Sequence, residues 1–235
     1  HVQMGGLSQP YQTAVIENIH RAIEQCGRDI VFSLSAEVPP VRQAEHLQQH
    51  VNSWPIVKTP VNDWAAFRQI FNNCREWQYY IGPEHFPDLG LLPITSASSF
   101  TEEQKRAVIT LWSIVRSPIF LSGDLQQLDA ASLALLSNKE LIGVHQNSYN
   151  NEELYVAKYG IVWAASDRLS SDWYVALFNT SETEQTIRVD WGTLGWTGSH
   201  RVRDLWAEKD LGHFEGTFYG RIPPQGAGLY RVYSQ

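Results

Sequence analysis

Carboxylates in loops after short apolar runs are the side chains most able to do chemistry in this sequence. These loops contain the following acidic residues and one histidine: Glu37, Asp63, Glu84, His85, Asp88 and Asp124. Two carboxyls that face one another can hydrolyse a glycosidic bond, at about 5 to 5.5 Å for retention of configuration and about 6.5 to 9.5 Å for inversion. The loops supply such groups, and the fold decides whether two of them meet.

Each of these candidates also has an ordinary structural interpretation. Asp88 is either a sugar-binding or acid carboxyl, or a side chain that accepts hydrogen bonds from loop backbone N–H groups. Glu37 is either a sugar-binding acid or a solvated loop residue. For Asp63 we favour the N-cap of the following helix, because aspartate is a preferred cap. His85 as a base and Asp124 as an acid compete with roles in ordinary loops and turns.

Aromatic and polar neighbours of these loops are candidate substrate contacts. The sequence has nine Trp, ten Tyr and nine Phe, and the C–H faces of a pyranose pack well on such rings. Trp54 is therefore a candidate to stack on a sugar, with a position in the core as the alternative. Lys58 and Thr59 follow it, in the loop after a predicted strand.

Residues before about 147 carry alternating helix and strand signals. Helical spacing of apolar residues predicts helices over Tyr11–Cys26 and 42–51, and a third around Phe67–Cys74. Thr101 and Gln104 form a capping-box pattern before another helix. A last helix is expected to begin at Asp129 and to extend through Leu133, Leu136 and Leu141.

Short apolar runs between these helices predict buried parallel strands. The predicted strands are Ile30–Leu34, Ser53–Thr59, Trp77–Ile81 and Ile119–Leu121. Regular alternation of this kind indicates a parallel sheet covered by helices, that is, an α/β fold. In a (β/α)8 barrel the site is built by loops after the carboxyl ends of the strands, where the candidate carboxylates stand.

After about residue 148 the pattern changes to short strands without a helical period. The expected strands are Tyr155–Ala164, Trp173–Asn179, Thr186–Asp190, His200–Trp206 and Gly228–Tyr233. Gly, Asn, Ser and Pro turns separate them, which is typical of an antiparallel β-sandwich. We therefore expect two domains, residues 1–147 and 148–235.

Composition excludes several classes of function. With a net charge of −7, the sequence has no basic cluster suited to nucleic acid, and no apolar run reaches the roughly 18 to 20 residues of a membrane span. Cys26 and Cys74 stand far apart, which indicates neither a zinc site nor a redox pair. A complete barrel needs about 250 residues, so we expect the first half of the barrel to lie outside these residues.

Several segments, in order, resemble the α-galactosidase (melibiase) family of glycoside hydrolases. They are Gly27–Ser33, the Trp54 and Trp64 pair, Gly82–Asp88, Leu111–Ile114, Ser117–Leu125, Leu136–Ile142 with His145–Asn147, Val175–Asn179, Arg203–Trp206 and Pro223–Arg231. The resemblance implies the C-terminal half of a (β/α)8 barrel followed by an all-β domain. It also implies a retaining glycosidase that acts on terminal α-linked sugars without metal or organic cofactor, in a secreted or periplasmic setting.

The sequence departs from the family at the expected catalytic positions. The family's nucleophile follows a strand that precedes His1 here, and its general acid lies midway between the paired tryptophans, where this sequence has Thr59. Pro55 replaces a sugar-binding arginine, and Gly90 replaces the second aspartate of a later motif that keeps Asp88. A threonine hydroxyl cannot replace a carboxylic acid as proton donor.

We therefore expect Asp88 and Glu37 to be the catalytic candidates, and Trp54, Lys58, Thr59 and His85 to bind substrate. The expected partners are a carbohydrate and the missing half of the barrel, with neither nucleic acid nor membrane. By itself the chain is expected to be inactive. Two alternatives remain: a catalytically silent sugar-binding homologue, or a fragment that does not function alone.

Overall fold

The computed structural model describes residues 2–3, 11–35, 37–58, 61–95, 98–121 and 125–234. Up to residue 147, helices alternate with short strands. In chain order these elements are β1 (Val2–Gln3), α1 (Thr13–Gln25), β2 (Leu34–Ser35), α2 (Ala44–His50), β3 (Ser53–Pro55), α3 (Trp64–Trp77), β4 (Phe86–Asp88), β5 (Leu91–Leu92), α4 (Glu102–Ile114), β6 (Phe120–Leu121), α5 (Ala130–Ser137) and α6 (Lys139–Asn147).

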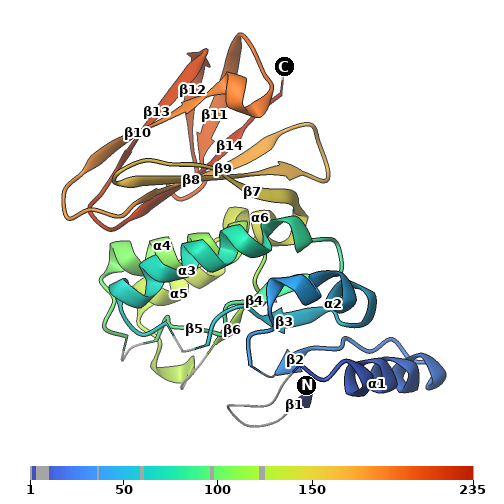
Figure 1. Ribbon diagram of the computed structural model, residues 1–235. Helices are drawn as coiled ribbons and strands as arrows, with labels where there is room; N and C mark the ends of the chain where they lie inside the picture. The colour runs from blue at the N-terminus through green and yellow to red at the C-terminus, as the bar shows by residue number, and fades with distance from the viewer. Residues whose placement is uncertain are drawn as a thin grey trace.

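From Ser148 onward the chain forms an antiparallel sandwich. Its strands are β7 (Ser148–Val156), β8 (Gly160–Asp167), β9 (Trp173–Asn179), β10 (Gln185–Asp190), β11 (Ser199–Asp204), β12 (Lys209–Glu215), β13 (Thr217–Ile222) and β14 (Ala227–Val232). One sheet has the order β12-β11-β14-β9-β8-β7, and β10 pairs with β13 in the other. The chain is thus α/β followed by all-β, as predicted (Figure 1).

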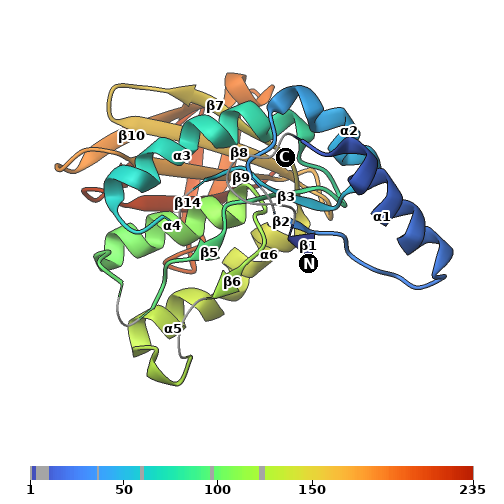
Figure 2. The ribbon, with the colours of Figure 1, turned by 60° about the horizontal axis from the view of Figure 1, so that its bottom comes forward.

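The short strands of the first part form a parallel row. β1 pairs with β2, a bridge between Ser33 and Ser53 links the region of β2 to β3, and β3 pairs with β4. β4 and β5 are two parts of one stretch separated by Leu89 and Gly90, and β5 pairs with β6. Figure 2 shows this row with the helices to one side. Such a row is part of the wall of a (β/α)8 barrel.

One face of this row is buried against the helices and the other is open. Trp54 and Leu89 are fully buried, whereas Leu91 and its partner Phe120 are 53% and 54% exposed. Gly90 has φ +81, a conformation open to glycine, and it interrupts the alternation of sides along the strand. The open face is therefore partly apolar, which is unusual for a surface in water.

Local capping signals determine where the helices begin. Asp63 Oδ1 accepts a hydrogen bond from Ala66 N at 2.8 Å, so the predicted cap of α3 is confirmed. Thr101 and Gln104 form the complete capping box at the start of α4. Asp129 caps α5 as predicted, but the last helix is divided, because Asn138 ends α5 and caps α6.

The helices and the sandwich share a hydrophobic core. Ile161, Trp163 and Ala165 on β8 face the helices, while Val162 and Ala164 face the second sheet. Figure 1 shows α3, α4 and α6 between the large sheet and the short strands. The strand alternation of β8 therefore serves two cores, one shared with the barrel helices and one inside the sandwich.

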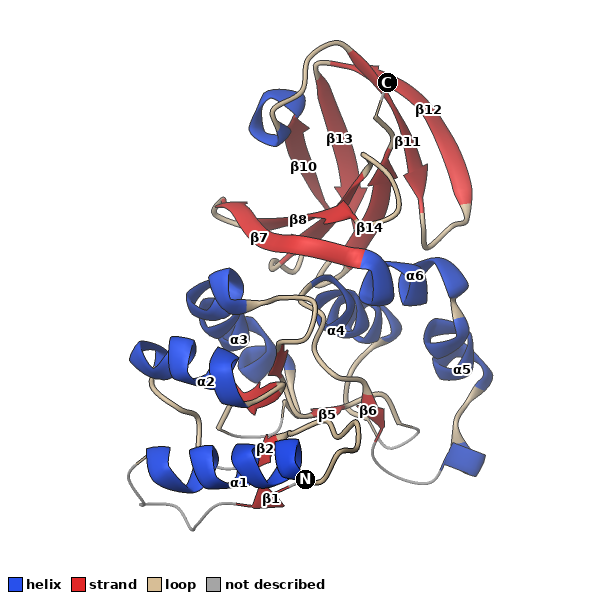
Figure 3. Ribbon diagram, turned by 90° about the vertical axis from the view of Figure 1, so that its right-hand side faces the viewer, coloured by secondary structure: helices blue, strands red, loops and turns tan. Residues whose placement is uncertain are grey.

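Aromatic and charged side chains cross between the two parts. The rings of Phe71 on α3 and Phe178 on β9 lie 5.0 Å apart. Arg75 contacts Glu153 in a bidentate pair at 2.6 and 3.2 Å. Together with the shared core, these contacts hold the sandwich on the helices. Figure 3 shows the sandwich lying over the helices α3, α4 and α6.

The structure corrects the third predicted strand. Trp77 ends α3, and residues 78–80 form a 3-10 turn in which the buried Gln78 side chain accepts a hydrogen bond from Glu153 N at 2.7 Å. The strand that follows β3 in the row is instead β4 with β5. In the sandwich, the predicted strand Tyr155–Ala164 is the end of β7, a turn and the start of β8, and β12 and β13 were not predicted.

Candidate functional site

Asp88 is the carboxylate that the parallel strands position best. It ends β4, where its backbone carbonyl accepts a hydrogen bond from Ile56 N at 3.0 Å. Its Oδ1 accepts a second hydrogen bond from Gly90 N at 2.7 Å. Because Asp88 pairs with Pro55, while the neighbouring pair of Trp54 and Pro87 is buried, the Asp88 carboxyl lies on the open face.

The surroundings of Asp88 raise the pKa of its carboxyl. Burial raises the pKa of Asp88, and the hydrogen bond from Gly90 N–H lowers it by less. No Lys or Arg contacts Asp88 in the part of the chain that the structure describes. A carboxyl with a raised pKa can keep its proton and give it to a leaving oxygen. The hydrogen bond from Gly90 N also shows that one oxygen of Asp88 accepts from a loop backbone N–H group, as the structural interpretation of this residue expected.

Glu37 and Lys58 lie beyond the carboxyl ends of neighbouring strands. Glu37 is exposed after β2, and Lys58 is exposed after β3. No hydrogen bond or ion pair joins Glu37 to Asp88 within the described ranges. Lys58, together with Val38, Val57 and Asn73, lines a pocket of about 250 Å³ beside α3. These two side chains are accessible to a ligand, and their roles stay predictions.

His85 lies at the opposite end of the strands, which corrects its expected place at the site. Since the strand after β3 is β4, His85 precedes this strand instead of following it. Its Nε2 contacts Gln48 O at 2.8 Å, and Gly82 pairs with its backbone. A barrel binds substrate at the carboxyl ends of its strands. We therefore assign His85 to the packing of the amino end.

Trp54 lies in the core, which was the alternative to stacking on a sugar. Its side chain is fully buried on the helix side of β3, and its ring lies 5.7 Å from the ring of Trp77 and 6.1 Å from that of His85. A ring with no exposed surface offers no face to a pyranose. This placement argues against stacking on a sugar and for a role in the barrel wall.

Thr59, Asp124 and Asp63 complete the set of candidates from the sequence. Thr59 and Asp124 lie outside the described residues. Asp63 points its carboxylate at the first turn of α3, where it accepts the hydrogen bond from Ala66 N. That interaction uses the side chain as a cap, which favours Asp88 and Glu37 over Asp63 as acid candidates.

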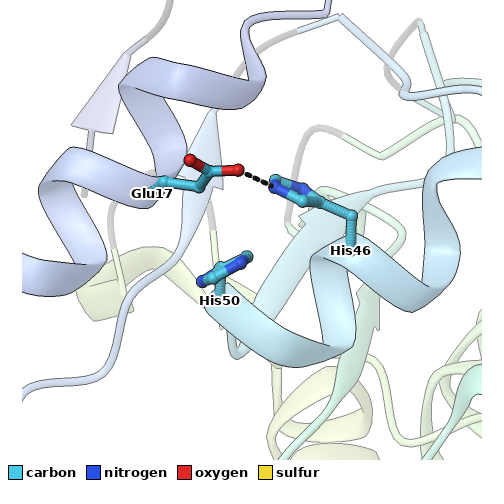
Figure 4. Close-up of side chains that lie close together, drawn as sticks. All are labelled: Glu17, His46 and His50. Carbon is cyan, nitrogen blue, oxygen red and sulfur yellow. Dashed lines mark ion pairs between the residues drawn. The ribbon is translucent and has the colours of Figure 1, made fainter.

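A group of possible metal ligands lies away from this face, and the sequence analysis missed it. Glu17 on α1 and His46 and His50 on α2 each offer one ligand atom, all within 4.8 Å of one another (Figure 4). The available signal was the spacing of His46 and His50, which places both on one side of a helix. Neither cysteine belongs to this group. Cys26 is exposed and Cys74 is buried in the core.

Family models match nearly the whole chain in two consecutive parts. A model described as alpha galactosidase A matches residues 7–147. A second, described as the alpha galactosidase C-terminal beta sandwich domain, matches residues 159–232.

Among the residues described, no helix has the length and apolar character needed to cross a membrane.

Curated relatives of the chain are named as α-galactosidases. Alpha-galactosidase 3 of Arabidopsis thaliana is 29% identical over 218 residues, which are 89% of this chain and 49% of the relative. An alpha-galactosidase of Oryza sativa subsp. japonica is 26% identical, over 89% of this chain and 50% of its own length. The chain thus spans about half the length of these relatives.

Solved structures agree with the fold over the same extent. A β-L-arabinopyranosidase of Geobacillus stearothermophilus is 31% identical with a TM-score of 0.89, covering 94% of this chain and 54% of its own. A variant of that enzyme was solved in complex with arabinose. Alpha-galactosidase I of Mortierella vinacea, at 18% identity and a TM-score of 0.82 over 95% of this chain and 63% of its own, shows the fold alone.

Proposed function

Because the chain belongs to the α-galactosidase family of glycoside hydrolases, we propose that the whole protein hydrolyses a terminal glycosidic bond and that this chain supplies the last strand–helix units of its barrel. The observation that carries the proposal is the Asp88 carboxyl, held on the open face of the strands in surroundings that raise its pKa. In a barrel this face is the interior, and its carboxyl end forms the site.

The proposed chemistry divides the work between two carboxyls. The Asp88 carboxyl gives its proton to the leaving glycosidic oxygen, then takes a proton from the water that completes hydrolysis. Glu37 is the second candidate for this role, or a hydrogen-bond acceptor for a sugar hydroxyl. A nucleophilic carboxylate from the segment before His1 would attack the anomeric carbon and give a covalent intermediate, as a retaining mechanism requires.

Completion of the barrel is part of the same proposal. Leu91 and Phe120 lie side by side on the open face with more than half of their surface exposed. Burial of such apolar area stabilises an interface by about 25 cal/mol per Å². The occupant we propose is the preceding half of the barrel, since the chain spans about half of its relatives.

Activity measurements on the chain and on the full-length protein test the proposal. The 235-residue chain alone is expected to leave aryl α-galactosides and aryl β-L-arabinopyranosides intact, because in this proposal the nucleophile comes from the preceding half of the barrel. The full-length protein is expected to cleave at least one of them with retention. Turnover by the purified chain alone would show that the catalytic carboxylates are misplaced here.

Substrate choice within this group rests on the substituent at C5 of the sugar ring. The most similar of the structures described above acts on β-L-arabinopyranosides, whereas the curated relatives are α-galactosidases. Both sugars share a ring arrangement and differ at the substituent on C5. We propose a substrate of this shape, and the ratio of kcat/KM for the two aryl glycosides would decide between them. From the family resemblance we also propose that the whole protein is secreted or periplasmic.

A catalytically silent sugar-binding protein is the second candidate function. It is favoured by the absence of a carboxyl at Thr59 and by the replacement of family residues at Pro55 and Gly90. In that case the full-length protein would bind galactose or arabinose in calorimetry and show no turnover of either aryl glycoside. Saturable binding with measurable turnover would exclude this candidate.

A further inference from the structure

Two helices at one side of the molecule bring three imidazoles and a carboxylate together. Glu17 and His20 are on α1, and His46 and His50 are on α2. Figure 4 shows Glu17 facing both His46 and His50 across the gap between the helices. The spacing of four residues puts both α2 histidines on the same side of that helix. The arrangement thus joins side chains that are far apart in the sequence.

Two ring nitrogens in this group lack hydrogen-bond partners. Nε2 of His46 and Nδ1 of His50 are shielded from solvent, and neither forms a hydrogen bond within the described part of the chain. A buried polar atom without a partner destabilises the fold. Nε2 of His46 lies beside the Glu17 carboxylate, and His50 offers a ring nitrogen within 4.8 Å of the ligand atoms of the other two residues, so a single ligand between the helices can contact all three side chains.

The distances suit a metal ion. Nε2 of His46 lies 3.4 Å from Oε1 of Glu17, and one atom from each of the three residues lies within 4.8 Å of the others. Two ligands of a tetrahedral zinc ion, at about 2.0 to 2.2 Å from the metal, are separated by about 3.3 Å. Small side-chain rotations therefore close the set around one ion.

A neighbouring hydroxyl orients the first imidazole. Tyr11 Oη contacts Nδ1 of His46 at 2.7 Å, which leaves Nε2 directed at Glu17. Metal-binding histidines usually engage their second ring nitrogen in this way, because the contact selects the tautomer with a free lone pair.

From this geometry we propose that Glu17, His46 and His50 form a zinc site that links α1 to α2. Two imidazoles and a carboxylate are a donor set that Zn²⁺ accepts, with a water molecule as fourth ligand. The site is separate from the proposed glycosidase chemistry, since its ligands come from helices and not from the open face of the strands. Its role would be to fasten α1, in which only Ile16 is buried.

Titration of the untagged 235-residue chain with ZnCl2 tests the proposal. We expect saturable binding of one Zn²⁺ per chain and slower hydrogen exchange of the α1 amides when zinc is bound. His46→Ala and His50→Ala are each expected to weaken binding by at least 100-fold. Tyr11→Phe should weaken it by about 10-fold, because outer-shell partners contribute about 10- to 100-fold in affinity.

His213→Ala is the matched control, because it removes an exposed histidine from β12 in the sandwich. It should leave the affinity unchanged. Far-UV circular dichroism checks that each variant is folded, and His46→Gln and His50→Gln replace any alanine variant that is not. The absence of one-to-one binding would overturn the proposal. So would a zinc affinity of the His46 and His50 variants equal to that of the unsubstituted chain.

Discussion

Burial of the Asp88 carboxyl has opposite consequences for chemistry and for stability. The raised pKa makes the Asp88 carboxyl better suited to carry a proton for transfer. The same burial disfavours the ionised form in the folded chain. Below the unfolded pKa both states are protonated and nothing is lost. As the pH rises, the unfolded chain ionises first, so folded-state stability falls until the pH exceeds the folded pKa.

Because the raised Asp88 pKa lowers the stability of the folded chain as the pH rises, a substitution at this residue has a predictable effect. Asp88→Asn should raise the melting temperature of the chain at pH 7 and have little effect at pH 3, since the amide carries no charge and can still accept from Gly90 N. Thermal denaturation at the two pH values measures the difference. Asp29→Asn, at an exposed position, is the control. An equal effect of Asp88→Asn at both pH values would contradict the assignment of burial as the cause.

The catalytic prediction at the same residue concerns the full-length protein. Asp88→Asn is expected to lower kcat/KM by about 10²- to 10⁴-fold, with the largest loss on substrates with poor leaving groups. Glu37→Gln is tested in parallel, and Asp63→Asn serves as control because asparagine also caps helices. If Asp63→Asn abolished turnover while Asp88→Asn and Glu37→Gln kept wild-type rates, the assignment of the acid would be wrong.

At the scale of single elements, the capping box of α4 shows how a few residues determine where a helix begins. Its capping box satisfies backbone N–H groups at its start, with Thr101 Oγ1 accepting from Gln104 N and Gln104 Oε1 accepting from Thr101 N. Nearly all of the helix is then buried between the strands and the sandwich. A correct start is therefore needed for the helix to present the right side to each layer.

Removal of this cap has a predictable cost. Thr101→Ala should lower the free energy of unfolding by about 1 kcal/mol, within the usual range of about 0.5 to 2 kcal/mol for such caps. Urea denaturation followed by circular dichroism measures it. Thr13→Ala, at the exposed first position of α1, is expected to change stability much less. A smaller loss at Thr101 than at Thr13 would contradict the prediction.

The same elements show what the sequence could and could not predict. Caps and helices were predictable, because Asp63, Thr101 and Asp129 act on backbone groups a few residues away. The third strand was not, because Pro87 and Gly90 suggest a loop, and only pairing with β3 and β6 makes these residues a strand. Because the third predicted strand was misplaced, His85 was expected at the carboxyl end of the strands, and it was therefore wrongly included in the predicted site.

Across the whole molecule, the helices and the sandwich are expected to unfold together. Phe71 and Phe178 pack between them, and β8 and β9 contribute to the core shared with the helices. A unit whose main core spans both parts has no boundary at which one part can unfold and leave the other intact. A single transition in calorimetry is the expected result, and two separate transitions would contradict it.

Two phenylalanine variants compare the shared core with the open face. Phe71→Ala should cost about 3 to 5 kcal/mol in the chain and lower the whole transition. Phe120→Ala should change the stability of the chain by less than about 0.5 kcal/mol, as exposed substitutions usually do. In the full-length protein Phe120→Ala should become clearly destabilising. An equal effect of Phe120→Ala in both would argue against completion of the barrel at this face.

The change of partner along residues 86–92 also determines how the wall of strands curves. The stretch pairs with β3 up to Asp88 and with β6 only from Leu91, so it crosses its two neighbours obliquely. In a cylinder of strands, such slippage between neighbours, added around the circumference, sets the radius together with the strand number. Any further strands of this wall must continue the same slant to connect β6 with β1.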